Sequence, residues 1–127
     1  MRLHQVALPV SDLARATAFY SSLLDAQPIA TYDPPGLVFF DLAGVRLLLD
    51  RQAGPGATIY LQVDDVEQAV ADLAARGVEV AEPAHVVFPD QDGTFGPPGE
   101  DEWLAGIRDS EGNLVCLANR RPAKLTE

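Results

Sequence analysis

The fold is decided by two related stretches of sequence, QVALPVSDL at residues 5–13 and YLQVDDV at residues 60–66. In each stretch apolar and polar residues alternate as in a half-buried β-strand, and an aspartate then precedes an apolar residue. Ser11 or Asp12 can cap a helix in the first stretch, and Asp64 and Asp65 precede a capped helix start in the second, so each stretch predicts a strand that turns directly into a helix. The copies lie roughly fifty residues apart, which favours a duplicated unit over a solenoid of short repeats.

The rest of the first copy predicts one helix and three further strands. Apolar residues recur at three- and four-residue intervals after Asp12, which predicts an amphipathic helix to about Leu24. Residues 27–32 are typical of a short strand, and Leu37–Leu42 with Val45–Asp50 predict a hairpin joined by a tight turn. The predicted order is β-α-β-β-β.

The second copy repeats this order. Its helix is expected to run from Val66 to Arg76, with Gly77 in the left-handed conformation that commonly ends a helix. Its later strands are expected at 78–81, 103–109 and 113–119. We therefore predict one domain over residues 1–127, built from two units at 1–52 and 57–120.

Three segments are predicted to lie outside the regular elements. Residues 52–56 form a short linker, and residues 89–102 are rich in Gly, Pro and acidic residues. The second segment predicts a flap or loop at the edge of a cavity. The tail, residues 120–127, is polar and expected to be frayed.

Composition restricts the classes of partner. The net charge of −10 is unfavourable for binding phosphate backbones, so nucleic acid is not expected as a partner. The same acidity could attract a cationic ligand, although solubility is the plainer explanation. No apolar run approaches the roughly 20 residues of a membrane helix, and the first residues lack the pattern of a signal peptide. With one cysteine, Cys116, we expect a cytoplasmic protein.

Motifs near both ends of the chain resemble those of a known family. Residues 5–13, 18–20 and 23–24 are similar to the opening of vicinal oxygen chelate proteins, the superfamily of glyoxalase, bleomycin-resistance and dioxygenase proteins. Residues 109–114 are similar to its closing turn, with Ser110 where proline usually stands. The resemblance implies an α+β fold of two βαβββ units, each a half-barrel sheet with its helix on the convex side and a cavity on the concave side.

The resemblance also implies where a divalent metal would be held, on the first and last strands of each unit. Matching the motifs places these positions at Gln5, Leu48, Thr58 and Cys116. Leu48 has no donor atom, and Thr58 is a poor neutral oxygen ligand. Some glyoxalase I members use Gln at the first position, but a neutral amide needs carboxylate or imidazole companions. We therefore expect neither a metal ion nor another cofactor.

Strand alternation and the family positions together predict the residues that line the cavity. The predicted ligand-binding residues are Gln5, Arg46, Thr58, Tyr60, Trp103 and Cys116. This aromatic and polar mixture suits a flat or polar small molecule, although packing at the seam between units is an equal alternative. For Cys116 we favour a role as apolar filler over a nucleophile. An uncharged or cationic ligand is expected, because residues 100–102 are all acidic.

Three functions remain open from the sequence. The first is a metal-independent protein that binds a small organic molecule, as bleomycin-resistance proteins do. The second is a metal-free enzyme that uses His85 or Glu102 as general base, although a structural role for His85 is the alternative. The third is a metal-dependent lyase, isomerase or dioxygenase. A homodimer is expected, because an open half-barrel leaves apolar edges that related proteins bury against a second chain.

Overall fold

The computed structural model describes residues 1–54 and 56–123. Pro55 of the expected linker and residues 124–127 of the expected tail lie outside this range. The chain divides into two compact units. The first is Leu3–Ile59, and the second comprises the residues from Tyr60 onward together with Met1 and Arg2. The predicted repeat boundaries stay a prediction.

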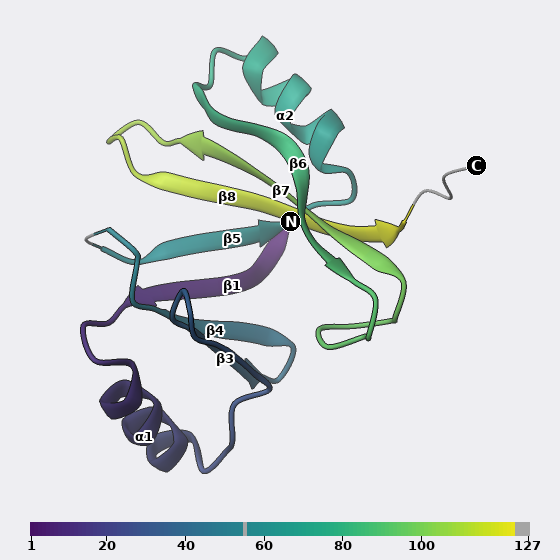
Figure 1. The fold of residues 1–127 in the computed structure, drawn as a ribbon. Helices are drawn as coiled ribbons and strands as arrows, with labels where there is room; N and C mark the ends of the chain where they lie inside the picture. The colour runs from purple at the N-terminus through teal and green to yellow at the C-terminus, as the bar shows by residue number, and fades with distance from the viewer. Residues whose placement is uncertain (55, 124–127) are drawn as a thin grey trace. The chain divides into compact units, whose positions relative to one another are not determined.

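The first unit contains one helix and a four-stranded mixed sheet (Figure 1). Its elements are β1 (Arg2–Pro9), α1 (Leu13–Leu24), β2 (Ala30–Tyr32), β3 (Leu37–Leu42) and β4 (Val45–Asp50). The strand order is β2-β3-β4-β1, in which β1 runs parallel to β4 and the other neighbours are antiparallel. The predicted helix and hairpin are confirmed at these boundaries.

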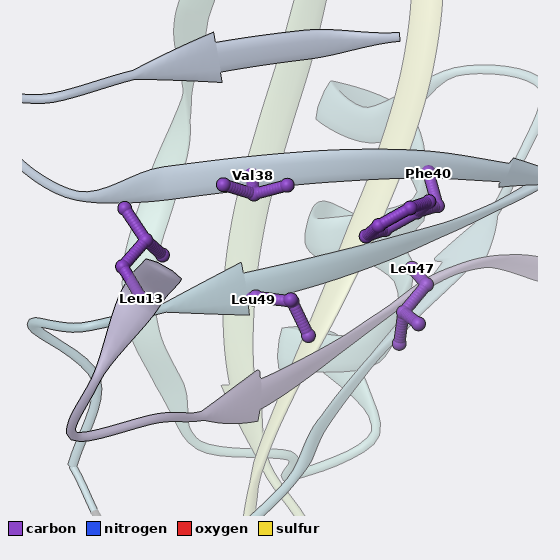
Figure 2. Close-up of a cluster of buried hydrophobic side chains, with 5 residues drawn as sticks. All are labelled: Leu13, Val38, Phe40, Leu47 and Leu49. Carbon is purple, nitrogen blue, oxygen red and sulfur yellow. The ribbon is translucent and has the colours of Figure 1, made fainter. Parts of the chain in front are cut away.

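The core of the first unit lies between α1 and one face of this sheet (Figure 2). Alternate residues of β3 and β4 point towards the helix, and Leu8 and Tyr20 pack against their side chains. The buried cluster consists of Leu13, Val38, Phe40, Leu47 and Leu49. Burial of each such side chain contributes about 1.5–3 kcal/mol, which fixes this face of the sheet against the helix. The residues between them in sequence therefore face away from α1.

The second unit repeats this order of elements. Its elements are β5 (Thr58–Gln62), α2 (Val66–Ala75), β6 (Val80–Asp90), β7 (Glu100–Arg108) and β8 (Leu114–Pro122), and only the first two residues of β5 fall within the other unit. The strand order is β5-β8-β7-β6, and α2 packs on β6, β7 and β8 (Figure 1). The predicted α+β fold of two βαβββ units, each with a helix on one side of its sheet, is therefore confirmed.

Both helices begin where the sequence predicts, and α1 ends at the predicted Leu24, whereas α2 ends at Ala75, one residue before the predicted end. The backbone nitrogen of Arg15 donates to Asp12 Oδ1 at 3.0 Å, and that of Gln68 donates to Asp65 Oδ1 at 3.2 Å. Gly77 follows α2 with a φ of +86°, a conformation that other residues adopt at a cost. In the described part of the chain, neither helix is long and apolar enough to cross a membrane.

Several predicted strand boundaries in the second unit are wrong. Strand β6 continues to Asp90, so His85 lies within it and the loop before β7 is shortened to residues 91–99. Three shifts in register along β6 break the alternation of its residues, which hid this strand from a search for periodicity. Strand β8 runs to Pro122, so the tail is regular further than expected.

Candidate functional site

In the first unit, a buried polar pair lies on the sheet face opposite α1. Gln5 on β1 and Arg46 on β4 are neighbours in the register, and their exposed fractions are 4% and 8%. Arg46 Nε donates a hydrogen bond to Gln5 Oε1 at 2.7 Å. A buried guanidinium is stable only where its donors find acceptors, so the amide oxygen of Gln5 fixes the orientation of Arg46.

His4 joins this pair although alternation separates it from Gln5. Arg46 Nη2 lies 3.0 Å from His4 Nε2. For this contact to be a hydrogen bond, the nitrogen Nε2 of His4 must be the acceptor, because a guanidinium can only donate. The sequence predicts opposite faces for His4 and Gln5, and the long side chain of Arg46 reaches both.

The same face of the first unit carries aromatic residues that were not predicted from the sequence. Phe39 on β3 is paired in the register with Leu48 on β4, which is paired with Ala7 on β1. The rings of Tyr32 and Phe39 meet edge to face with centroids 6.1 Å apart. The alternation of β3 could have predicted the position of Phe39. Val38 and Phe40 are in the core, so the side chain between them must point to the opposite face.

In the second unit, the face opposite α2 carries Cys116 and Glu82. Both are paired in the register with Gly106 of β7, so their side chains lie on one face. Burial, and then the charge of Glu82, raise the pKa of the Cys116 thiol to about 11. The thiol is therefore protonated at neutral pH, as in a buried apolar filler and unlike a nucleophile.

Trp103 points to the other face, which corrects the expectation that it shares a side with Cys116. Its register partner is Asn119, whose Oδ1 accepts a hydrogen bond from the backbone nitrogen of Val66 at the start of α2. Arg121 stacks over the Trp103 ring at 3.7 Å from its centroid and pairs with Glu67 of α2. The sequence predicts that Trp103 begins a strand at residues 103–109, whereas β7 begins three residues earlier, at Glu100.

Tyr60 and Thr58 lie on β5 with the alternation that the sequence predicts. The backbone nitrogen of Val63 donates to the carbonyl of Ala118 at 3.0 Å, and the equivalent bond in the first unit joins Val10 to Asp50. Equivalent registers place Tyr60 beside Cys116, on the face opposite α2. Whether Tyr60 or Thr58 binds a ligand stays a prediction.

His85 and Glu82 come together on this face because β6 is irregular. Three positions separate them, so an unbroken strand would point them to opposite sides. A register shift between them brings His85 Nε2 to 3.6 Å from Glu82 Oε1, while His85 Nδ1 lies 2.8 Å from the Pro83 carbonyl oxygen. If Nδ1 carries the proton, Nε2 is the nitrogen that can accept one.

Glu102, the other predicted base, belongs to a network around Arg120. Its Oε1 lies 3.8 Å from Arg120 Nη1, and the guanidinium also bonds Asp90 at 2.9 Å and Glu100 at 3.1 Å. Glu102 is buried and shares a face of β7 with Leu104, the register partner of His85. Asp90, Glu100 and Arg120 were not among the predicted site residues.

Two hollows lie within single units, and neither contains a predicted site residue. One of about 710 Å³ lies beside the start of α1 and includes Asp33 and Arg51, which form an ion pair at 2.6 Å. The other, about 670 Å³, lies between Gly77 and the turn at Asp109.

Known proteins share both the sequence pattern and the fold. The family model described as Glyoxalase/Bleomycin resistance protein/Dioxygenase superfamily matches residues 2–117. The chain belongs to this superfamily. No curated protein matches the sequence.

Several solved structures share the fold of this chain at low sequence identity. A superfamily member from Vibrio splendidus 12B01 has a TM-score of 0.64 at 17% identity and covers 94% of this chain and 98% of its own. A single-residue variant of methylmalonyl-CoA epimerase from Streptomyces coelicolor, in complex with 2-nitronate-propionyl-CoA, has a TM-score of 0.62 at 18% identity and covers 93% of each chain. A Legionella pneumophila protein described as NAD-dependent benzaldehyde dehydrogenase has a TM-score of 0.62 at 20% identity, covering 90% of this chain and 96% of that one. These similarities establish the fold alone.

The residues at the superfamily's metal positions do not fit a metal ion in this chain. Leu48 is buried and has no donor atom, and Gln5 Oε1 already accepts from a positively charged guanidinium. Thr58, at the third of these positions, offers only a neutral hydroxyl oxygen. Within residues 1–54 and 56–123, no three His, Cys, Asp or Glu side chains form a group that could hold a metal.

Proposed function

We propose that this superfamily member binds a small organic molecule through the sheet face that carries Gln5 and Arg46, without a metal ion. The observation that supports this is the hydrogen bond of 2.7 Å from Arg46 Nε to Gln5 Oε1. A cation placed at Gln5 would meet a full positive charge at the same oxygen. The position therefore favours recognition of an organic ligand by oriented polar groups over coordination of a metal.

The surface beside this pair suits a ligand with flat apolar parts. Tyr32 and Phe39 are only half-buried on the same face, and they meet edge to face. Aromatic contacts of this kind contribute about 0.5–1.5 kcal/mol beyond the area they bury. We propose an uncharged or cationic ligand over a phosphorylated one, which is supported by the net charge of −10.

Native mass spectrometry of untagged protein, together with elemental analysis, tests this proposal. We expect well under one transition metal per chain and, where a ligand is carried through purification, an added mass typical of a small organic compound. Crystals grown with no added ligand should then show density on the face that carries Gln5. A rise in melting temperature of several degrees with Ni, Zn, Mn or Fe that Gln5→Ala abolishes would contradict the metal-free proposal.

A second candidate is a metal-free enzyme with His85 as general base. It is favoured by the contact of His85 Nδ1 with the Pro83 carbonyl, which orients the ring and leaves Nε2 able to accept a proton. Deuterium uptake from D2O into small ketones, followed by NMR, tests this chemistry. We expect uptake that His85→Gln abolishes and His4→Gln does not, and equal rates in both variants would reject the role.

We also propose that the chain forms a homodimer in the cytoplasm. An exposed edge strand is prone to pair with a second chain, and β6 is at the end of its sheet. Val86 and Val87 on this strand are 40% and 48% exposed, which supports burial of the edge against a partner.

A further inference from the structure

The loop between β6 and β7, residues 91–99, is folded around a single buried carboxylate. Asp90 is 1% exposed, and its Oδ1 and Oδ2 accept hydrogen bonds from the backbone nitrogens of Thr94 and Phe95 at 2.8 and 2.9 Å. The backbone nitrogen of Gly99 donates to the carbonyl of Asp90 at 3.0 Å. The middle and the end of the loop therefore both return to the residue where the loop begins.

One side chain from a different strand closes this arrangement. Arg120 lies on β8, two strands from β6, and its Nη2 donates to Asp90 Oδ2 at 2.9 Å and to the Pro97 carbonyl at 3.2 Å. Its Nε donates to Glu100 Oε1 at 3.1 Å. A Cβ atom at Gly96 would lie 2.9 Å from Nε, so a larger residue there would require the guanidinium or the loop to shift.

The loop lies over the sheet face opposite α2. The residues of β6 and β7 that carry this face include Phe88 and Glu102, which are paired in the register. Phe95 of the loop meets Phe88 edge to face with ring centroids 5.4 Å apart. Cys116 and Arg120 are on the same face of β8, so the loop covers one end of the surface on which Cys116 lies.

One donor of the Arg120 guanidinium has no acceptor when the loop lies against it, an arrangement that we call the closed state. Arg120 Nη1 is buried and has no hydrogen-bond partner in the described part of the chain, and its distance of 3.8 Å from Glu102 Oε1 is beyond hydrogen-bond range. A buried donor without an acceptor weakens the closed state relative to an open one in which water reaches it. Several hydrogen bonds hold the loop closed. Movement of the loop would nevertheless allow water to accept a hydrogen bond from Arg120 Nη1.

We propose that residues 91–99 form a lid, that Arg120 and Asp90 form its latch, and that Phe88 and Phe95 bind an aromatic ring of the ligand when the lid moves. The latch is independent of any ligand. The role of the lid in recognition rests on the proposed function, because it requires that a small molecule binds the sheet.

Hydrogen exchange of backbone amides tests the latch without a ligand. In wild type, the amides of Thr94 and Phe95 should be protected. In Arg120→Gln and Asp90→Asn they should exchange at least about tenfold faster, because each change removes bonds that hold the loop closed. If Arg120→Gln does not fold, Asp90→Asn alone tests the latch, because it keeps the size of the side chain. The same tenfold acceleration of exchange at Thr94 and Phe95 is then expected.

Arg121→Gln is the matched control for the latch. Arg121 is the next residue on β8, and its guanidinium lies over Trp103 on the opposite face. We expect unchanged exchange at Thr94 and Phe95 in this variant. Equal acceleration in all three variants, or amides that are unprotected in wild type, would overturn the latch.

Benzyl alcohol and cyclohexylmethanol, two probes of similar size, test the aromatic recognition by NMR. We expect benzyl alcohol to bind about three- to tenfold more tightly at Phe88 and Phe95, and to lose this preference in Phe95→Leu. Equal binding, or no binding at this face, would overturn the recognition role. If benzyl alcohol instead shifts only resonances of Gln5 and Arg46, the lid is wrong and the proposed function stands. If neither alcohol shifts any resonance on the two sheet faces, both fail.

Discussion

Gln5 and Arg46 lie opposite each other on parallel strands, with the amide oxygen of Gln5 2.7 Å from Nε of Arg46. The resemblance to metal-binding relatives places a metal ligand at Gln5, and in this chain the same oxygen accepts from a cationic side chain. The hydrogen bond between Gln5 and Arg46 should therefore affect the stability of the fold as well as ligand binding. A buried guanidinium that loses an acceptor retains the cost of its burial.

Replacing Gln5 with alanine should lower the free energy of unfolding by about 1–3 kcal/mol, because Arg46 stays buried without this acceptor. Urea denaturation at pH 7 measures the change. Gln27→Ala, at an exposed position between α1 and β2, is the control and should change stability by less than about 0.5 kcal/mol. Equal effects of the two substitutions would show that the pair is not important for stability.

Acid should weaken the fold through Asp90. Burial by itself raises the pKa of Asp90, but hydrogen bonds from the backbone nitrogens of Phe95 and Thr94 and from Arg120 outweigh it and hold the pKa below the usual aspartate value. A lowered pKa contributes stability above the unfolded value of about 3.9, and this is lost as pH falls through the folded pKa.

Asp90→Asn should therefore be less stable than wild type at pH 7 and should lose less stability between pH 5 and pH 2. The groups that face Asp90 are Arg120 from β8 and Glu100 from β7, and both remain in the variant. Urea denaturation at several pH values measures the difference. Parallel curves for wild type and Asp90→Asn would contradict the assignment.

Cys116 should react slowly with thiol reagents in the native state. Burial, followed by the charge of Glu82, raises its pKa to about 11, so the reactive thiolate is scarce at pH 8. Relative to an ordinary cysteine of pKa about 8.5, the thiolate fraction falls by roughly 200-fold. Reaction with a chromogenic disulfide should be slower by at least this factor in native than in urea-unfolded protein, and comparable rates would argue for an accessible thiol.

Gly96→Ala should destabilise the protein and loosen the loop, since the added Cβ would lie 2.9 Å from Arg120 Nε. We expect a loss of about 1–3 kcal/mol, typical of an added methyl group without space. Gly54→Ala is the matched control, because nothing lies within 4 Å of its Cβ position. Thermal unfolding of both variants measures the difference, and an equally stable Gly96→Ala would show that the loop adjusts freely.

Light scattering at micromolar concentration should give twice the chain mass of 13.6 kDa. Val86→Lys with Val87→Lys, which places charge on the edge strand β6, should shift the protein towards the monomer. Leu3→Lys with Leu42→Lys, two other exposed apolar residues, is the control. A wild-type mass of 13.6 kDa would reject the dimer, and a dimer in both double variants would place its interface elsewhere.

The sequence alone determined the features that depend on near neighbours in the chain. Asp12 and Asp65 cap helices through nitrogens three residues away, and the hairpin of β3 and β4 closes through a tight turn, so both are visible as local patterns. The duplication could be recognised because the same local pattern occurs at residues 5–13 and again at residues 60–66. Gln5 and Arg46 could be assigned to one face because β1 and β4 alternate without interruption.

Tertiary structure decided what depends on register and on the reach of long side chains. The register shifts in β6 place His85 beside Glu82, and no periodic pattern predicts where a strand gains a residue. Trp103 faces α2 because its register partner is Asn119, whose side chain bonds the start of α2, whereas the residue type and position of Trp103 favoured a ligand face. Arg120 binds Asp90, thirty positions away, because only the folded sheet brings β8 near the end of β6.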